Sequence, residues 1–153
     1  MPEKPLEIAA LSQTLPPEWP EDLLSFICRQ VAQDRTRIVV LDDDPTGTQT
    51  VHGLPVLTTW EVPALEKELM NSASAFYILT NSRALPRDQA CRLGQVIGAN
   101  LKQAGRNTAV PISVISRSDS TLRGHFPFEV DAVAHAMGDT GLSYLICPFF
   151  LEG

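Results

Sequence analysis

The chain has 153 residues, of which 44% are hydrophobic and 20% charged, and its net charge is −6. This length and composition are typical of one folded domain, and the acidic balance argues against nucleic acid as a partner, which would require a basic surface. No run approaches the roughly 18 apolar residues that a membrane span needs, and the N-terminus lacks the features of a signal peptide. Because the three cysteines are odd in number and widely spaced, we expect no disulfide framework and a reducing, cytoplasmic location.

Hydrophobic periodicity predicts helices that alternate with strands along most of the chain. A proline-rich arm without periodicity (1–17) precedes a predicted helix over 18–33. The remaining predicted elements are, in order, a strand over 37–41, a short edge strand over 53–58, a helix over 61–71, a strand over 75–79, a helix over 86–104 that stops at Gly105, a strand over 110–115, a helix over 126–137 that stops at Gly138, and a strand over 143–147. The alternation favours a three-layer α/β/α fold with a mainly parallel sheet.

We divide the chain into an N-terminal arm and helix (1–34) and an α/β domain (35–153). Because the last predicted strand has no closing helix after it, we expect a domain that is truncated at its C-terminus. The exposed apolar edges of such a fragment could let two copies associate as a homodimer.

Polar loops follow three of the predicted strands, with the sequences DDDPTGTQT, TNSR and SRSDSTLRG. The carboxyl ends of parallel strands meet at one edge of a sheet, so we expect these loops to converge. The edge would then offer carboxylates as acceptors and arginines as donors: Asp42, Asp43, Asp44 and Asp119, with Arg83, Arg117 and Arg123. Arginine binds carboxylate or phosphate bidentately, and carboxylates accept hydrogen bonds from hydroxyls. A small polyhydroxy acid is therefore the predicted ligand.

Each loop also has a simpler structural explanation. Asp-Pro-Thr-Gly is a common turn sequence, and the segment 118–121 could cap a helix. Asn81 and Ser82 could satisfy a strand end, and His125 could be a local hydrogen-bonding residue. A shared function is favoured because three separate loops carry such residues to the same edge.

The segments LDDDPTGTQTVHG, YILTNSRAL, SRSDSTLRGH and ICPFFLEG, in that order, resemble the N-terminal domain of the four-carbon acid sugar kinases. The resemblance covers residues 37–153 and implies a substrate-binding domain of an enzyme that phosphorylates a tetronate-type sugar acid. It implies ATP and Mg²⁺ as cofactors of the full-length enzyme, bound by a C-terminal nucleotide-binding domain. Since this chain has no Gly-rich phosphate loop, we expect it to bind neither cofactor and to be inactive alone.

The resemblance also implies the site residues. The family's Asp-Asp-x-Thr-Gly element corresponds to residues 43–47, and its Asp-Ser-Thr-Leu-Arg-Gly element to residues 119–124. The expected substrate-binding residues are Asp43, Asp44, Thr46, Gly47, Asn81, Ser82, Arg83, Arg117, Asp119, Ser120, Thr121 and Arg123. Asp44 and Asp119 are the two candidates for the catalytic base, and no metal ligand is expected. Arg117 stands where many relatives carry lysine, so the substrate could differ.

We expect Arg117 and Arg123 to hold the substrate's carboxylate. We also expect them to balance the charges of Asp42, Asp43 and Asp44, because ionising three adjacent carboxylates is energetically unfavourable without nearby cations.

Two other functions remain open from the residues alone. Asp42 to Thr46 fits the D-x-D-x-T pattern of haloacid dehalogenase-like phosphatases, with Asp42 as nucleophile, Asp44 as general acid and Mg²⁺ between them. That family also needs a downstream lysine, and no lysine follows Ala109. The second alternative is a non-catalytic module that binds small acids.

Overall fold

The computed structural model describes residues 8, 13–17, 20–119, 123–139, 141 and 143–147. The chain divides into two compact units, residues 1–34 and 35–153. In the first unit, helix α2 (Leu23–Gln33) begins after Asp22, whose carboxylate accepts a 3.0 Å hydrogen bond from the backbone N–H of Leu24. An aspartate in this position satisfies a helical N–H that has no partner within the helix, so the helix starts later than predicted.

The second unit is built on a four-stranded sheet with the order β2-β3-β1-β4, in which every strand pair is parallel. The strands are β1 (Arg37–Asp42), β2 (Val56–Leu57), β3 (Ala75–Leu79) and β4 (Ile112–Arg117). Strand β2 follows Pro55 and lies at one edge of the sheet, as predicted, since a proline cannot donate to a central ladder. The parallel α/β class is confirmed.

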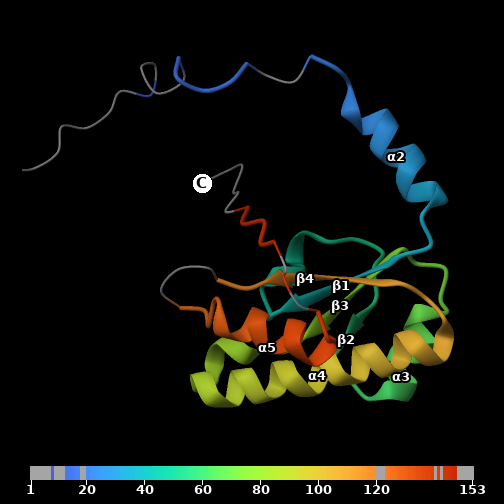
Figure 1. Ribbon diagram of the computed structural model, residues 1–153, viewed down its shortest axis with the longest axis vertical. Coiled ribbons are helices and arrows are strands. Elements are labelled where there is room, and N and C mark those ends of the chain that lie inside the picture. Colours follow the sequence, from blue (N-terminus) through green and yellow to red (C-terminus); the bar gives the residue numbers. More distant parts are fainter. Residues whose placement is uncertain are drawn as a thin grey trace, which may run out of the picture. The chain divides into compact units, whose positions relative to one another are not determined.

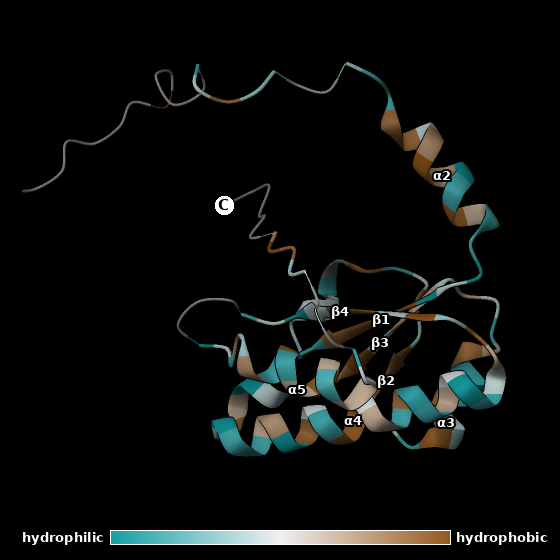
Figure 2. Cartoon of the chain, in the orientation of Figure 1, coloured by the Kyte–Doolittle hydropathy of each residue, from teal (hydrophilic) through white to brown (hydrophobic). Residues whose placement is uncertain are grey.

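Helices α3 (Val62–Leu69), α4 (Arg87–Thr108) and α5 (Phe128–Met137) lie on one face of this sheet (Figure 1). Figure 2 shows apolar residues along the strands and mixed hydropathy around the helices. The core joins alternate residues of the strands to the inner faces of the helices, and it includes Val39, Leu41, Leu65, Leu69, Phe76, Ile78, Ile97, Leu101 and Val133. Among the described elements of this unit, only 3-10 helices and loops remain for the other face.

Helix α4 corrects one predicted boundary, because it continues through Gly105 to Thr108 and ends at Ala109, which has a left-handed φ of 54°. A Cβ on Gly105 would lie 2.9 Å from a side-chain carbon of Ile112. This glycine therefore permits close helix–strand packing rather than ending the helix. Helix α5 does end at Gly138, whose φ is 87°, as predicted from the preference of this position for glycine.

The strand predicted over 143–147 is wrong, since these residues form no strand and Leu145 is 90% exposed. Periodicity identifies residues that suit a sheet, but a strand also needs a neighbour that pairs with it.

Candidate functional site

The register of the sheet brings the three polar loops together. Asp42 lies opposite Leu79 on one side and Arg117 on the other, so the three strands end in the same row. The backbone N–H of Thr80 donates to the carbonyl of Asp42 (2.8 Å), and the N–H of Asp43 donates to the carbonyl of Arg117 (3.4 Å). The predicted convergence is therefore present, and we call this group of loops (42–50, 80–84, 117–119 and 123–125) the rim.

Asp42 is the innermost carboxylate of the rim and is fully buried. Arg117 Nη1 donates to its Oδ1 at 3.1 Å, whereas its Oδ2 has no hydrogen-bond partner among the described residues. Burial raises the pKa of this carboxyl, and Arg117 opposes the rise. Gly47 packs directly against the Asp42 carboxylate and the Arg117 guanidinium, because a Cβ at this position would overlap both groups. Asp42 is thus enclosed by the turn that follows it.

Asp43 is also buried and connects the three loops. Arg83 binds it bidentately, with Nε 3.1 Å from Oδ2 and Nη2 2.8 Å from Oδ1. The backbone N–H of Asp119 donates to Oδ2 at 3.2 Å. One carboxylate therefore ties the loop after β1 to the loops after β3 and β4, and bidentate pairs of this kind are strong and directional.

Asp44 lies further out, with 23% of its side chain exposed. Its Oδ1 accepts hydrogen bonds from the N–H (2.8 Å) and hydroxyl (2.5 Å) of Thr46, and its Oδ2 accepts one from Arg83 Nη1 (2.8 Å). The Thr46 hydrogen bonds, aided by Arg83, lower the pKa of Asp44. The carboxylate is therefore ionised at neutral pH and can accept hydrogen bonds from a ligand's hydroxyls.

The loop after β4 supplies the two most exposed arginines of the described part of the rim. Arg123 binds Asp119 Oδ2 through Nε and Nη2, both at 2.7 Å, and 72% of its side chain is exposed. Arg117 has 46% of its side chain exposed although one of its nitrogens binds Asp42. Gly124 keeps this loop tight, since a Cβ there would overlap the backbone carbonyl of Asp119. Ser120 and Thr121, also expected at the site, lie outside the described residues.

The pairing of charges differs from the expectation that Arg117 and Arg123 balance the acidic run. Arg83 pairs with two of the three acids and Arg117 with the third, whereas Arg123 pairs with Asp119. Strands β3 and β4 both adjoin β1, on opposite sides, and it is the exit loop of β3 that brings Arg83 within reach of both outer carboxylates.

The segment after β3 presents one expected site residue outward and another inward. Asn81 is exposed and has a left-handed φ of 51°, a conformation that asparagine tolerates. It precedes the 3-10 helix η2 (Ser82–Ala84), whose first residue is buried. The hydroxyl of Ser82 faces Thr80 Oγ1 at 3.0 Å, and its carbonyl lies 3.2 Å from His125 Nε2. The His125 ring therefore contacts the turn after β3, 43 residues away in the sequence, rather than a neighbour in its own loop.

Glu129 is the polar residue that the sequence analysis missed. It lies in the first turn of α5, is 5% exposed, and its Oε2 has no hydrogen-bond partner among the described residues. Burial raises the pKa of Glu129, and the nearby Ser82 hydroxyl opposes the rise. The sequence did contain a signal for the burial of Glu129. This residue precedes the inward-facing Val133 by four positions, and residues four apart lie on the same face of a helix.

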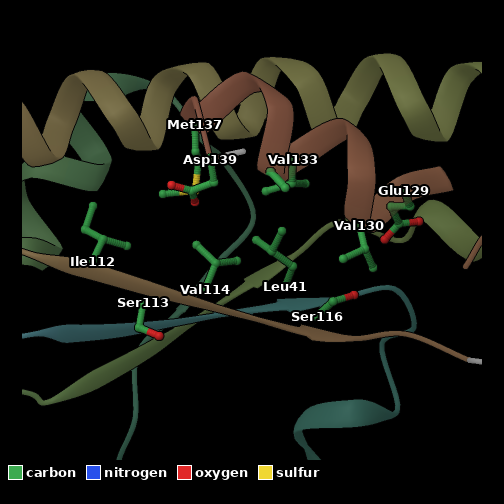
Figure 3. A pocket seen from close by; sticks show the side chains of 11 residues that line it. Leu41, Ile112, Ser113, Val114, Ser116, Glu129, Val130, Val133, Met137 and Asp139 are labelled. Carbon is green, nitrogen blue, oxygen red and sulfur yellow. The ribbon is translucent and has the colours of Figure 1, made fainter. Parts of the chain in front are cut away.

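A cavity of about 260 Å³ lies between β4 and α5 (Figure 3). Its wall is mainly apolar, with Leu41, Val114 and Val133 near its middle and Glu129 at one end. None of Asp43, Asp44 and Arg83 lines it. The cavity therefore lies on the helical face of the sheet and is separate from the charged rim.

Comparison with known proteins identifies the family of the chain. The sequence profile described as "Sugar-binding N-terminal domain" matches residues 38–153. The chain belongs to this family, the N-terminal domain of the four-carbon acid sugar kinases. It is similar to a D-erythronate kinase of Heliobacterium modesticaldum, with 28% identity over 124 residues. The match covers 77% of this chain but 27% of that protein, so this sugar-binding domain corresponds to about a quarter of its relative. No solved structure matches the chain.

The phosphatase alternative disagrees both with the family of the chain and with the position of Asp42. Its nucleophile would be Asp42, which is buried beneath Gly47 and paired with Arg117. A phosphate group could not reach this carboxylate without displacing the turn.

In the described ranges of the chain, no group of three or more His, Cys, Asp or Glu side chains is placed to hold one ion. The neighbouring acids of the rim face arginines instead.

No helix in the described part of the chain is long and apolar enough to cross a membrane.

Proposed function

We propose that this chain is the part of an ATP-dependent kinase that binds a four-carbon sugar acid of the tetronate type and holds it for phosphorylation. The observation that carries the proposal is the layout of the rim, in which paired acids lie inside and exposed arginines outside. Family membership supports the kinase role, and the similar D-erythronate kinase supports the choice of a four-carbon acid.

In this proposal the substrate's carboxylate binds the exposed guanidinium groups of Arg117 and Arg123. Guanidinium binds a carboxylate through two parallel N–H groups, and both side chains present more surface than Arg83, of which 20% is exposed. Asp44 accepts hydrogen bonds from substrate hydroxyls, since it is ionised and partly exposed.

Phosphoryl transfer requires a residue that accepts the proton of the attacking hydroxyl and positions its oxygen. Asp44 and Asp119 are the two carboxylates of the rim that reach solvent, with 23% and 10% of their side chains exposed. We assign this role to one of them. ATP supplies the phosphoryl group, and its Mg²⁺ neutralises charge on the phosphates; both bind the remainder of the full-length protein in this proposal.

Isothermal titration calorimetry of the chain with D-erythronate and D-threonate tests the binding role, with the uncharged polyol erythritol as control. We expect the acids to bind and erythritol not to bind, because only the acids carry a carboxylate for the arginines. Arg117→Ala should weaken acid binding at least tenfold, whereas Arg106→Ala, which removes an exposed arginine on α4, should leave it unchanged.

Equal binding of erythritol and the acids, or no binding of any acid, would contradict the proposal. Repeating the titrations with ATP present separates a substrate domain from a self-sufficient kinase: ATP turnover by the isolated chain would show that it contains the complete site.

A further inference from the structure

The cavity between β4 and α5 has a mainly apolar wall built from three elements. Leu41 of β1, Val114 of β4 and Val133 of α5 lie around its middle (Figure 3). Its volume of about 260 Å³ suffices for a small organic molecule, since an apolar cavity of about 150 Å³ in another protein binds benzene. An apolar group that enters such a cavity leaves water and contacts the wall, so its binding is favourable. The wall therefore fits a ligand with an apolar body.

One end of the cavity carries a buried carboxyl group. Glu129, in the first turn of α5, lines this end (Figure 3) and is 5% exposed. Its Oε2 is buried and has no hydrogen-bond partner among the described residues. A buried polar atom without a partner costs free energy. A ligand that brings a hydrogen-bond donor to this oxygen would remove that cost.

The charge of the lining selects the kind of donor. Among the described residues that line the cavity, the charged side chains are those of Glu129 and Asp139, and no Lys, Arg or His is present. Asp139 is exposed, so Glu129 is the carboxyl that an enclosed ligand would meet. Burial raises the pKa of Glu129, and a cation in contact with the carboxylate would oppose that rise. An ammonium group is both a cation and an N–H donor, whereas an anion would be repelled.

The pleat of the sheet separates this cavity from the rim. Leu41 lies opposite Ser116 in the register of β1 and β4, and both residues line the cavity. The next pair in the register, Asp42 and Arg117, belongs to the rim and forms an ion pair there. Successive side chains of a strand point to opposite faces of a sheet, so the two pairs serve different faces. A ligand of the cavity and a ligand of the rim therefore use different residues.

We propose that the cavity is a second binding site, which takes a small primary amine with an apolar body. The ammonium group binds the carboxylate of Glu129, and the apolar body lies between β4 and α5. This ligand is a cation, whereas the ligand that the proposed function assigns to the rim is an anion. Neither site depends on the other.

Nuclear magnetic resonance titration of the isotope-labelled chain tests the site, with 2-phenylethylamine as the probe. Two analogues of similar shape serve as controls: neutral 2-phenylethanol and anionic 3-phenylpropionate. We expect the amine to bind at least tenfold more tightly than the alcohol, and the anion to bind more weakly than the alcohol. The amide shifts that the amine causes should be largest at residues of β4 and α5 that line the cavity, such as Val114, Val130 and Ala134.

Three variants separate the contribution of the carboxylate from that of the apolar wall. Glu129→Gln removes the charge at nearly constant size, so it should weaken amine binding at least tenfold and change alcohol binding less than threefold. Ala134→Leu adds volume to the wall of the cavity and should weaken both ligands at least tenfold. Asp88→Asn removes an exposed acid of α4 that does not line the cavity, and it should change neither affinity by more than threefold.

No binding of the amine, equal affinity for the amine and the alcohol, or shifts confined to the acidic loops of the rim would overturn the proposal. Amine binding that is unchanged in Glu129→Gln would overturn it as well. Should Glu129→Gln or Ala134→Leu not fold, the three probes and the map of shifts on the wild type decide by the same criteria. D-erythronate that fails to bind contradicts the proposed function alone, and an amine that fails to bind contradicts the second site alone.

Discussion

The rim contains two kinds of aspartate that differ in burial although they are chemically identical. Asp42 and Asp43 are buried and hydrogen-bonded to the framework of the sheet and its loops. Asp44 and Asp119 have 23% and 10% of their side chains exposed. The inner pair connects strands and loops, whereas the outer pair can reach a ligand.

This difference shows that a run of identical residues need not act as one unit. Asp42 is the last residue of β1, so its side chain takes the direction that the strand imposes. Asp43 and Asp44 follow in the turn, where Arg83 separates them by binding the first with two nitrogens and the second with one. Under the proposed function, structural and ligand-directed roles are thereby divided within three residues.

Asp43→Ala should produce the largest effect, because it removes the carboxylate that joins all three loops. It leaves a partly buried Arg83 with Asp44 as its remaining partner, and breaking a buried pair in this way costs about 3 kcal/mol. Urea unfolding followed by circular dichroism would measure this change. Stability equal to the wild type would show that Asp43 does not anchor the rim.

Gly47→Ala should destabilise the protein by about 1–3 kcal/mol, the usual cost of added volume in a packed region. The new methyl group would overlap the Asp42 carboxylate and the Arg117 guanidinium, so the turn must move away from the inner pair. The same urea measurement applies, with Gln49→Ala at an exposed position nearby as the control. An unchanged midpoint for Gly47→Ala would mean that the turn does not pack on Asp42.

Asp44→Asn should reverse the pattern of Asp43→Ala, with little change in unfolding and a large change in function. Asn cannot accept a proton or carry the charge that Thr46 and Arg83 stabilise. In a full-length relative, at least one of the substitutions equivalent to Asp44→Asn and Asp119→Asn should lower kcat at least tenfold. If kcat is retained in both, neither residue is the base.

Asp42→Asn should give the smallest effect, visible as a difference in pH dependence. The folded-state pKa of Asp42 is raised above the ordinary value of 3.8, so the folded protein binds the proton more tightly than the unfolded chain does. Its contribution to stability is present below pH 3.8 and is lost as the pH rises through the folded pKa. The free energy of unfolding of Asp42→Asn relative to wild type should therefore rise from acidic to neutral pH. A constant difference across this range would contradict the raised pKa.

Much of the α/β framework was predictable because its signals are local. The apolar run before Asp42 and the segment Ala75–Leu79 became central parallel strands, and Pro55 correctly placed its strand at an edge. Helix ends were less predictable. Gly105 and Gly138 look alike in the sequence, but one packs against Ile112 and the other ends α5 with a positive φ, which depends on what each faces.

The sequence by itself determined that three polar loops would meet at one edge, since the strand–helix alternation implies a parallel sheet and parallel strands end on the same side. Tertiary structure alone decided which charges pair across that edge. Arg83 reaches Asp43 and Asp44 because β3 adjoins β1, and Arg117 reaches Asp42 because β4 adjoins its other side. Burial was decided in the same way: Glu129 became buried only when α5 packed on α4, because the exposure of a carboxylate depends on its spatial neighbours rather than on its neighbours in the chain.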